Sequence, residues 1–176
     1  MSQQENKYSL WATPNDQTRE KLQALIDKLA EQQDSSSFVP HITLVGNIFA
    51  SPDNLPKEKE KIEKLSKNIH KFKVTLFEYG YLNEEFRSLF LIARSDQLSN
   101  VYTEAAKLFP QMRKEPFQEL PHLSVLYGKY DQAIKSNIIA ANPLNIIEIE
   151  VESFDLYLTN NSVPTWQLEE QFLLAI

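Results

Sequence analysis

The sequence predicts an α+β fold with two pseudo-symmetric lobes around a central cleft. Segments with helical and strand periodicity are mixed along the chain, and several strand segments follow one another directly, which favours antiparallel pairing. A short phrase also occurs twice: Pro-His-Ile-Thr at residues 40–43 returns as Pro-His-Leu-Ser at residues 121–124, a little under half the chain later. This repeat predicts that each lobe contributes one equivalent strand to the cleft.

The first half of the chain predicts two strands and two helices in alternation. Leu22, Leu25 and Leu29 recur at helical spacing, and the pair Ser51-Pro52 is typical of a helix start, where a capping hydroxyl precedes a proline in the first turn. The predicted elements are a strand at residues 8–12, a helix from residue 15 or 16, a strand at 38–49 and a helix from 51.

The second half repeats this alternation and ends in β-rich segments. Ile147, Ile149 and Val151 alternate with glutamates, which predicts a strand with one exposed face. The predicted elements are strands at residues 72–82 and 88–95, a helix from 95 or 96, a strand at 120–127, a helix at 131–140, and β-rich stretches at 146–158 and 165–175.

Length and composition bound the possible functions. The 176 residues fit a single bilobal domain over residues 1–176, and the 42% hydrophobic and 24% charged fractions are ordinary for a globular protein. The chain contains no cysteine, which excludes disulfides, thiol catalysis and thiolate zinc sites. The sequence shows neither a signal peptide nor an apolar span, so we expect a cytoplasmic protein that does not bind membranes.

The acidic balance of the chain also constrains its partners. Sustained binding of duplex or long single-stranded nucleic acid depends on several lysine or arginine contacts to phosphates, and a net charge of −6 disfavours it. A small anionic ligand held at one point remains compatible with this charge. We therefore expect a small-molecule cyclic phosphate or nucleotide as partner, with RNA termini as a further option.

Each copy of the repeated phrase places a histidine two residues before a hydroxyl. On a strand, residues i and i+2 project from the same face, so His41 lies beside Thr43 and His122 beside Ser124. An unpartnered buried polar group costs about 1–3 kcal/mol. An imidazole and a hydroxyl on a buried strand face are therefore expected only where they have polar partners. Their repetition predicts that all four side chains face one polar cleft.

Two imidazoles and two hydroxyls are suited to phosphodiester chemistry. Hydrolysis needs a base that deprotonates water and an acid that protonates the departing oxygen, and histidine populates both forms near neutral pH. The hydroxyls of Thr43 and Ser124 can donate to the non-bridging phosphate oxygens and hold the phosphorus between His41 and His122. Nothing in this arrangement requires a metal or another cofactor.

These residues resemble the two-histidine phosphoesterase superfamily, most closely its cyclic phosphodiesterase branch. The resemblance covers nearly the whole chain in order and includes the opening Tyr-Ser-Leu-Trp of residues 8–11, Phe86-Arg87-Ser88 and a late Trp166. It implies an antiparallel sheet with flanking helices in each lobe. It also implies metal-independent opening of a cyclic phosphate, such as a nucleoside 2′,3′-cyclic phosphate or ADP-ribose 1″,2″-cyclic phosphate.

The resemblance carries over residue by residue to the repeated phrase. By motif, His41 and His122 are the catalytic pair, and Thr43 and Ser124 bind the phosphate. Aromatic residues near the motifs can stack on a nucleobase, and the candidates for substrate binding are Tyr127, Trp11 and Tyr8, with Trp166 as a weaker one.

Other functions remain open at this stage. Within the same superfamily, the chain could open or join 2′-5′ or cyclic phosphate termini of RNA. From a different class, it could be a nucleotide-binding module without turnover, although a pure binder has no need of an acid/base pair. A metal hydrolase is disfavoured, because the chain has only three histidines and no His-Glu-x-x-His motif.

Overall fold

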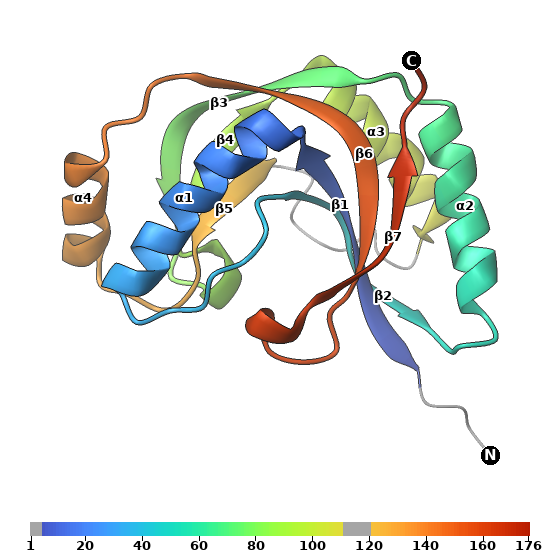
Figure 1. The fold of residues 1–176 in the computed structure, drawn as a ribbon, viewed down its shortest axis with the longest axis horizontal. Helices are drawn as coiled ribbons and strands as arrows, with labels where there is room; N and C mark the ends of the chain where they lie inside the picture. Colours follow the sequence, from blue (N-terminus) through green and yellow to red (C-terminus); the bar gives the residue numbers. More distant parts are fainter. Residues whose placement is uncertain (1–4, 111–120) are drawn as a thin grey trace.

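Strands close into a ring in the computed structural model, which describes residues 5–110 and 121–176. Within these residues a sheet of seven strands has the order β1-β2-β5-β4-β3-β6-β7, and a further pairing of β1 with β6 closes six of them into a barrel (Figure 1). All of the pairings between these strands are antiparallel. The strands are β1 (Asn6–Pro14), β2 (Ile42–Ala50), β3 (Phe72–Tyr81), β4 (Leu89–Arg94), β5 (His122–Leu126), β6 (Ile147–Leu158) and β7 (Gln167–Leu173).

The ring has an internal two-fold arrangement. The chain runs β1-α1-β2-α2-β3 and then repeats the pattern as β4-α3-β5-α4-β6. The two halves are joined through strands at their ends, because β3 pairs with β4 and β6 pairs with β1. The predicted α+β fold with two pseudo-symmetric, antiparallel halves is thereby confirmed, and the sheets of the two halves form one continuous ring. The helices are α1 (Asp16–Gln32), α2 (Leu55–Lys67), α3 (Asp96–Leu108) and α4 (Gln132–Ala141).

Local sequence accounts for where two of the helices begin. Before α1, the side chain of Asn15 accepts a hydrogen bond from the backbone N–H of Thr18. Before α3, the hydroxyl of Ser95 accepts one from the backbone N–H of Leu98. Each cap satisfies one of the free N–H groups of the first turn, as expected for asparagine and serine at this position.

Two of the predicted elements begin four residues later in the structure. The second helix begins at Leu55 and not at Ser51, because the Ser51 carbonyl accepts the N–H groups of Asn54 and Leu55 in a preceding turn. Pro56 then supplies the proline of the first helical turn. The strand with the first motif begins at Ile42, so His41 stands immediately before β2.

The helices pack across the two halves. Helix α1 packs against β5 of the second half, and α3 packs against β2 of the first half. In Figure 1, α1 and α4 lie toward the left of the sheet and α2 and α3 toward the right. Within residues 5–110 and 121–176, the helices lack the length and apolar character that a membrane crossing requires.

Candidate active site

The two motif strands meet at the middle residue of each motif. Ile42 pairs with Leu123, and both side chains are fully buried in the hydrophobic core. Because side chains alternate along a strand, the histidine and the hydroxyl on either side of each core residue face the opposite way. The pseudo-two-fold axis of the barrel therefore passes between the two motifs and brings them to one side of the sheet.

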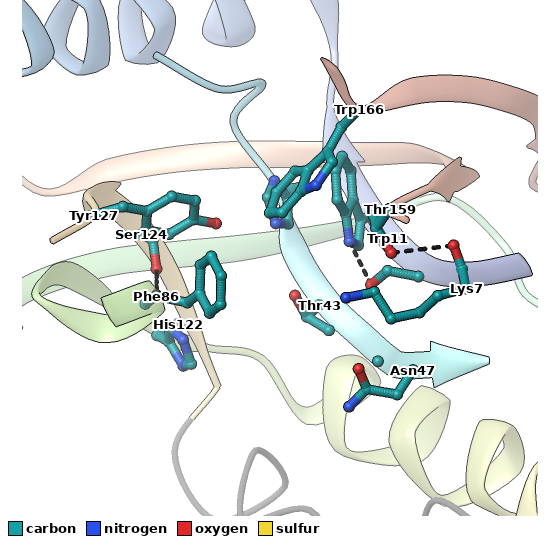
Figure 2. A pocket seen from close by; sticks show the side chains of 13 residues that line it. Lys7, Trp11, Thr43, Asn47, Phe86, His122, Ser124, Tyr127, Thr159 and Trp166 are labelled. Carbon is teal, nitrogen blue, oxygen red and sulfur yellow. Dashed lines mark hydrogen bonds between the residues drawn. The ribbon is translucent and has the colours of Figure 1, made fainter. Parts of the chain in front are cut away.

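The four motif side chains line a single pocket of about 310 Å³. Tyr127 and Trp11 join them, and Figure 2 shows Thr43 between the side of the pocket that holds Ser124 and Tyr127 and the side that holds Asn47. The lining residues are Lys7, Ser9, Trp11, His41, Thr43, Gly46, Asn47, Phe86, His122, Ser124, Tyr127, Thr159 and Trp166.

His41 is held in one tautomer by its backbone neighbour. Its Nδ1 lies 2.6 Å from the carbonyl oxygen of Val39. A carbonyl can only accept a hydrogen bond, so Nδ1 carries the hydrogen and Nε2 of the neutral ring is left with its lone pair. Burial is the main reason that the pKa of His41 is lowered from 6.5 to about 4; the charge of His122 acts in the same direction, and the bond to Val39 opposes both.

The indole ring of Trp11 packs against the imidazole ring of His41. The His41 ring stacks on one face of the indole, with centroids 3.6 Å apart and an interplanar angle of 10°. Tyr157 stacks on the indole with a centroid distance of 4.0 Å, and the indole N–H donates to the Ser9 hydroxyl at 2.7 Å. Trp11 is only 2% exposed. These contacts leave no open ring face for the nucleobase stacking expected of Trp11, and its place in the structure is as the support of the imidazole.

His122 has a pseudo-symmetric but looser support. Trp11 pairs with Thr43 in the first half, and Phe90 pairs with Ser124 in the second, so Phe90 is the counterpart of Trp11. The rings of Phe90 and His122 are 4.9 Å apart and tilted by 53°. Sequence symmetry made the two histidines interchangeable, and their different aromatic neighbours now distinguish them.

The two hydroxyls differ in their hydrogen bonding. The Ser124 hydroxyl donates to the backbone carbonyl of Phe86 at 2.9 Å, so its hydrogen must turn away from that carbonyl before it can reach a phosphate oxygen. Thr43 is half-buried at the pocket wall, and the Tyr102 hydroxyl donates to its carbonyl oxygen at 2.8 Å. The backbone on which the Thr43 hydroxyl is carried is therefore fixed by the core.

Aromatic side chains form one end of the pocket. Tyr127 is buried and stacks on Phe38 with centroids 3.7 Å apart, and burial raises its pKa, so the phenol stays neutral. Phe86 is 51% exposed and Trp166 half-buried, with their centroids 6.1 Å apart. These two rings present more accessible surface to a ligand than Trp11 does.

Tyr8 does not join the other predicted site residues. It is 2% exposed and belongs to the hydrophobic core. The strand alternation that turns Lys7, Ser9 and Trp11 toward the pocket turns Tyr8 the other way. The polar character of Lys7 and Ser9, in phase with Trp11, was the signal in the sequence for this face of the strand.

The described part of the chain holds no group of three or more histidine, aspartate or glutamate side chains arranged to ligate a metal ion. What the pocket offers to a ligand is two imidazoles, hydroxyls, one lysine and aromatic rings. Such a set can bind an anionic, partly aromatic ligand and can exchange protons with it.

Comparisons with known proteins identify relatives of this chain. A model of the 2′-5′ RNA ligase superfamily matches residues 9–162. A protein of Arabidopsis thaliana named cyclic phosphodiesterase is 22% identical over 131 residues, which cover 74% of this chain and 70% of that protein.

Solved structures share the fold. TT0787 of Thermus thermophilus has a TM-score of 0.67 and 17% identity, with 96% of this chain and 97% of that chain covered. E. coli LigT complexed with 3′-AMP has a TM-score of 0.66 and 14% identity, with 98% and 100% covered. At these identities the similarity shows the fold, and the chemistry has to be argued from the site.

Proposed function

Because the chain belongs to the 2′-5′ RNA ligase superfamily of two-histidine phosphoesterases, we propose that it hydrolyses a cyclic phosphodiester to a phosphomonoester. The substrate is a nucleoside 2′,3′-cyclic phosphate or ADP-ribose 1″,2″-cyclic phosphate. The reaction uses His41 and His122 as base and acid and needs no metal. The Arabidopsis thaliana relative named cyclic phosphodiesterase supports this choice within the superfamily.

One observation carries the proposal: His41 and His122 come from different halves of the chain and line the same pocket. The charge of His122 lowers the pKa of His41, so the two rings interact electrostatically. Thr43 and Ser124 stand beside them in the same pocket and can hold the non-bridging oxygens of the phosphate.

The surroundings of His41 favour it as the general base. Burial lowers its pKa, so the ring is neutral near pH 7. The bond from Nδ1 to Val39 leaves Nε2 as the nitrogen that takes a proton from water. A bound phosphate favours the imidazolium form, so the pKa of His41 rises when substrate enters, which improves a base that is weak in the empty pocket.

His122 then acts as the general acid. Water attacks phosphorus as its proton passes to Nε2 of His41, and the ester bond to the departing ribose oxygen breaks. The imidazolium of His122 gives its proton to that oxygen, which becomes a hydroxyl. The phosphate stays on the neighbouring ribose oxygen as a monoester. Transfer of a proton from His41 to His122 through solvent restores the starting state.

The proposal is tested with a substrate panel. Purified protein is given nucleoside 2′,3′-cyclic phosphates and ADP-ribose 1″,2″-cyclic phosphate with EDTA present, and phosphorus NMR identifies the monoester formed. We expect turnover of at least one substrate and a single product isomer. Folded protein that turns over none of them would contradict the proposal.

The family's description favours a second candidate, in which the pocket acts on the end of an RNA. A cyclic-phosphate-terminated oligonucleotide is compared with the corresponding mononucleotide that carries a 5′-phosphate. A mononucleotide enzyme shows no gain in kcat/KM with added nucleotides, whereas an RNA-end enzyme shows a clear gain. The net charge of −6 favours the first outcome, because added phosphates are repelled by an acidic surface.

A further inference from the structure

The end of the pocket opposite Phe86 and Tyr127 has a different chemistry. Lys7, Asn47 and Thr159 lie there, and Figure 2 shows the Lys7 side chain extending toward Thr43. Lys7 is the one lysine or arginine among the described residues that line the pocket, and no aspartate or glutamate lines it. In a chain of net charge −6, this makes the pocket a locally cationic site.

The backbone of Lys7 is anchored although it lies near the start of the chain. The Thr159 backbone N–H donates to the Lys7 carbonyl at 2.8 Å, and the Thr159 hydroxyl donates to the same oxygen at 3.3 Å. The Lys7 N–H donates to the side chain of Asn160. The Lys7 ammonium has no ion pair within residues 5–110 and 121–176. The fold therefore fixes the backbone of a lysine whose ammonium has no counter-charge among the described residues.

A bulge in β2 shapes the wall next to Lys7. Tyr8 pairs with Ile48 but Leu10 pairs with Val45, so β2 carries an extra residue here. Within this bulge Asn47 has a φ of 52°, in the left-handed region that asparagine tolerates better than most residues. Bulges commonly occur beside active sites, where they redirect a side chain. Here the bulge brings Asn47 to the pocket lining.

The charge balance of the pocket favours a second anion as the partner of Lys7. A cyclic phosphodiester carries one negative charge, which the imidazolium of His122 matches in the mechanism above. The Lys7 ammonium is a second positive charge in the same pocket, and it matches a second anion. Lysine is a common phosphate ligand, acting as a point charge.

We propose that Lys7, with Asn47 beside it, forms a second phosphate subsite, and that the substrate is a ribose with a cyclic phosphate and another phosphate on its 5-oxygen. This inference rests on the proposed function. ADP-ribose 1″,2″-cyclic phosphate and 5′-phosphorylated nucleoside 2′,3′-cyclic phosphates share this arrangement. A nucleoside 2′,3′-cyclic phosphate with a free 5′-hydroxyl lacks it.

The kinetic test compares adenosine 2′,3′-cyclic phosphate with its 5′-phosphorylated form. We expect the wild type to prefer the 5′-phosphorylated form by about tenfold in kcat/KM, and the preference to shrink with added salt. Lys7→Met removes the preference, and Lys7→Arg retains most of it. Asn47→Asp, which adds a negative charge, weakens it more than Asn47→Gly, which keeps the left-handed backbone.

Two kinetic results would overturn the subsite. The first is a wild type without preference for the 5′-phosphate. The second is an equal loss of kcat/KM for both substrates in Lys7→Met, which would place the lysine on the reacting phosphate.

A binding test is independent of turnover. Adenosine 3′,5′-bisphosphate and adenosine 3′-monophosphate are titrated calorimetrically into wild type and Lys7→Met. We expect the wild type to bind the bisphosphate about tenfold more tightly and the variant to bind both alike. If the preference is present but no cyclic phosphate is hydrolysed, the subsite stands and the proposed function fails. If the wild type binds both alike, the subsite is wrong whatever the turnover shows.

Discussion

Gly80 pairs with Phe90 across β3 and β4, and the Phe90 ring occupies the space that a side chain at position 80 would need. A Cβ atom built on Gly80 would lie 2.2 Å from Cε2 of Phe90. Phe90 is 1% exposed and its ring is 4.9 Å from that of His122. The absence of a side chain at position 80 therefore determines where the aromatic neighbour of a catalytic candidate lies.

Gly80→Ala tests this relationship. The added methyl displaces the buried Phe90 ring and with it His122, so we expect kcat to fall and the free energy of unfolding to fall by about 1–3 kcal/mol. Denaturant unfolding and steady-state kinetics measure the two effects. Gly46→Ala is the stability control, because the nearest atom to a Cβ there is 4.0 Å away. Unchanged stability in Gly80→Ala would mean that Phe90 moves freely.

Removing either imidazole should abolish most of the turnover. We expect His41→Ala and His122→Ala each to lower kcat by about 100-fold or more, since one general acid or base contributes roughly 10²–10⁴-fold. The exposed His70 binds the carbonyl of Ile176, outside the pocket, so His70→Ala should keep the wild-type rate. A nucleotide-binding module would instead retain ligand affinity in all three variants and show no turnover in the wild type.

The pH dependence of kcat/KM should reflect the buried state of His41. Neutral His41 is required as base and charged His122 as acid, so the profile is bell-shaped. Because burial lowers the pKa of His41 in the free protein to about 4, the acidic limb should lie near pH 4 and not near 6.5. An acidic limb at or above pH 6.5 would assign the base role to another group.

His41 should also make stability depend on pH. Its pKa is about 4 in the folded state against 6.5 as the reference for the unfolded chain, so the unfolded chain binds more protons between these values. The contribution of His41 to the free energy of unfolding is fully present above pH 6.5. It declines as the pH falls to about 4, by up to about 3 kcal/mol. Carboxylates titrate in the same range, so the measured quantity is the difference between wild type and His41→Gln. A difference that is constant with pH would contradict the lowered pKa.

Phe86 and Trp166 should govern binding of the base. Stacking contributes about 1–3 kcal/mol per base, so Phe86→Ala and Trp166→Ala should raise KM for nucleotide substrates by about 5- to 150-fold. A ribose cyclic phosphate without a base serves as the control substrate, and its KM should change little. Equal effects on both substrates would indicate that these rings shape the pocket and do not stack on the base.

The sequence was most informative where a periodic pattern decided the geometry. Alternation around Ile42 and Leu123 was enough to predict that the two histidines and two hydroxyls share a face, and the structure brings them to one pocket. The same rule applied to β1 would have selected Lys7 over Tyr8, but the aromatic character of Tyr8 outweighed its phase in the strand.

Other features depend on geometry that no local pattern encodes. Phe86 reaches the pocket from a 3-10 turn, and Asn47 reaches it through a bulge. The stacking of Trp11 between His41 and Tyr157 depends on β6, which follows β1 by most of the chain length. Such long-range pairings determine which aromatic ring is open to a ligand and which is covered.

Closure of the ring by β1 and β6 has a consequence for the order of assembly. Strand β1 cannot complete its hydrogen bonds until residues 151–158 have left the ribosome, and the Lys7 carbonyl has no partner until Thr159 has emerged. Pairings so distant in sequence form slowly, because a long loop must close first. A nascent chain that already contains both histidines is therefore still without a finished pocket, which is complete only after the residues up to Trp166 have emerged.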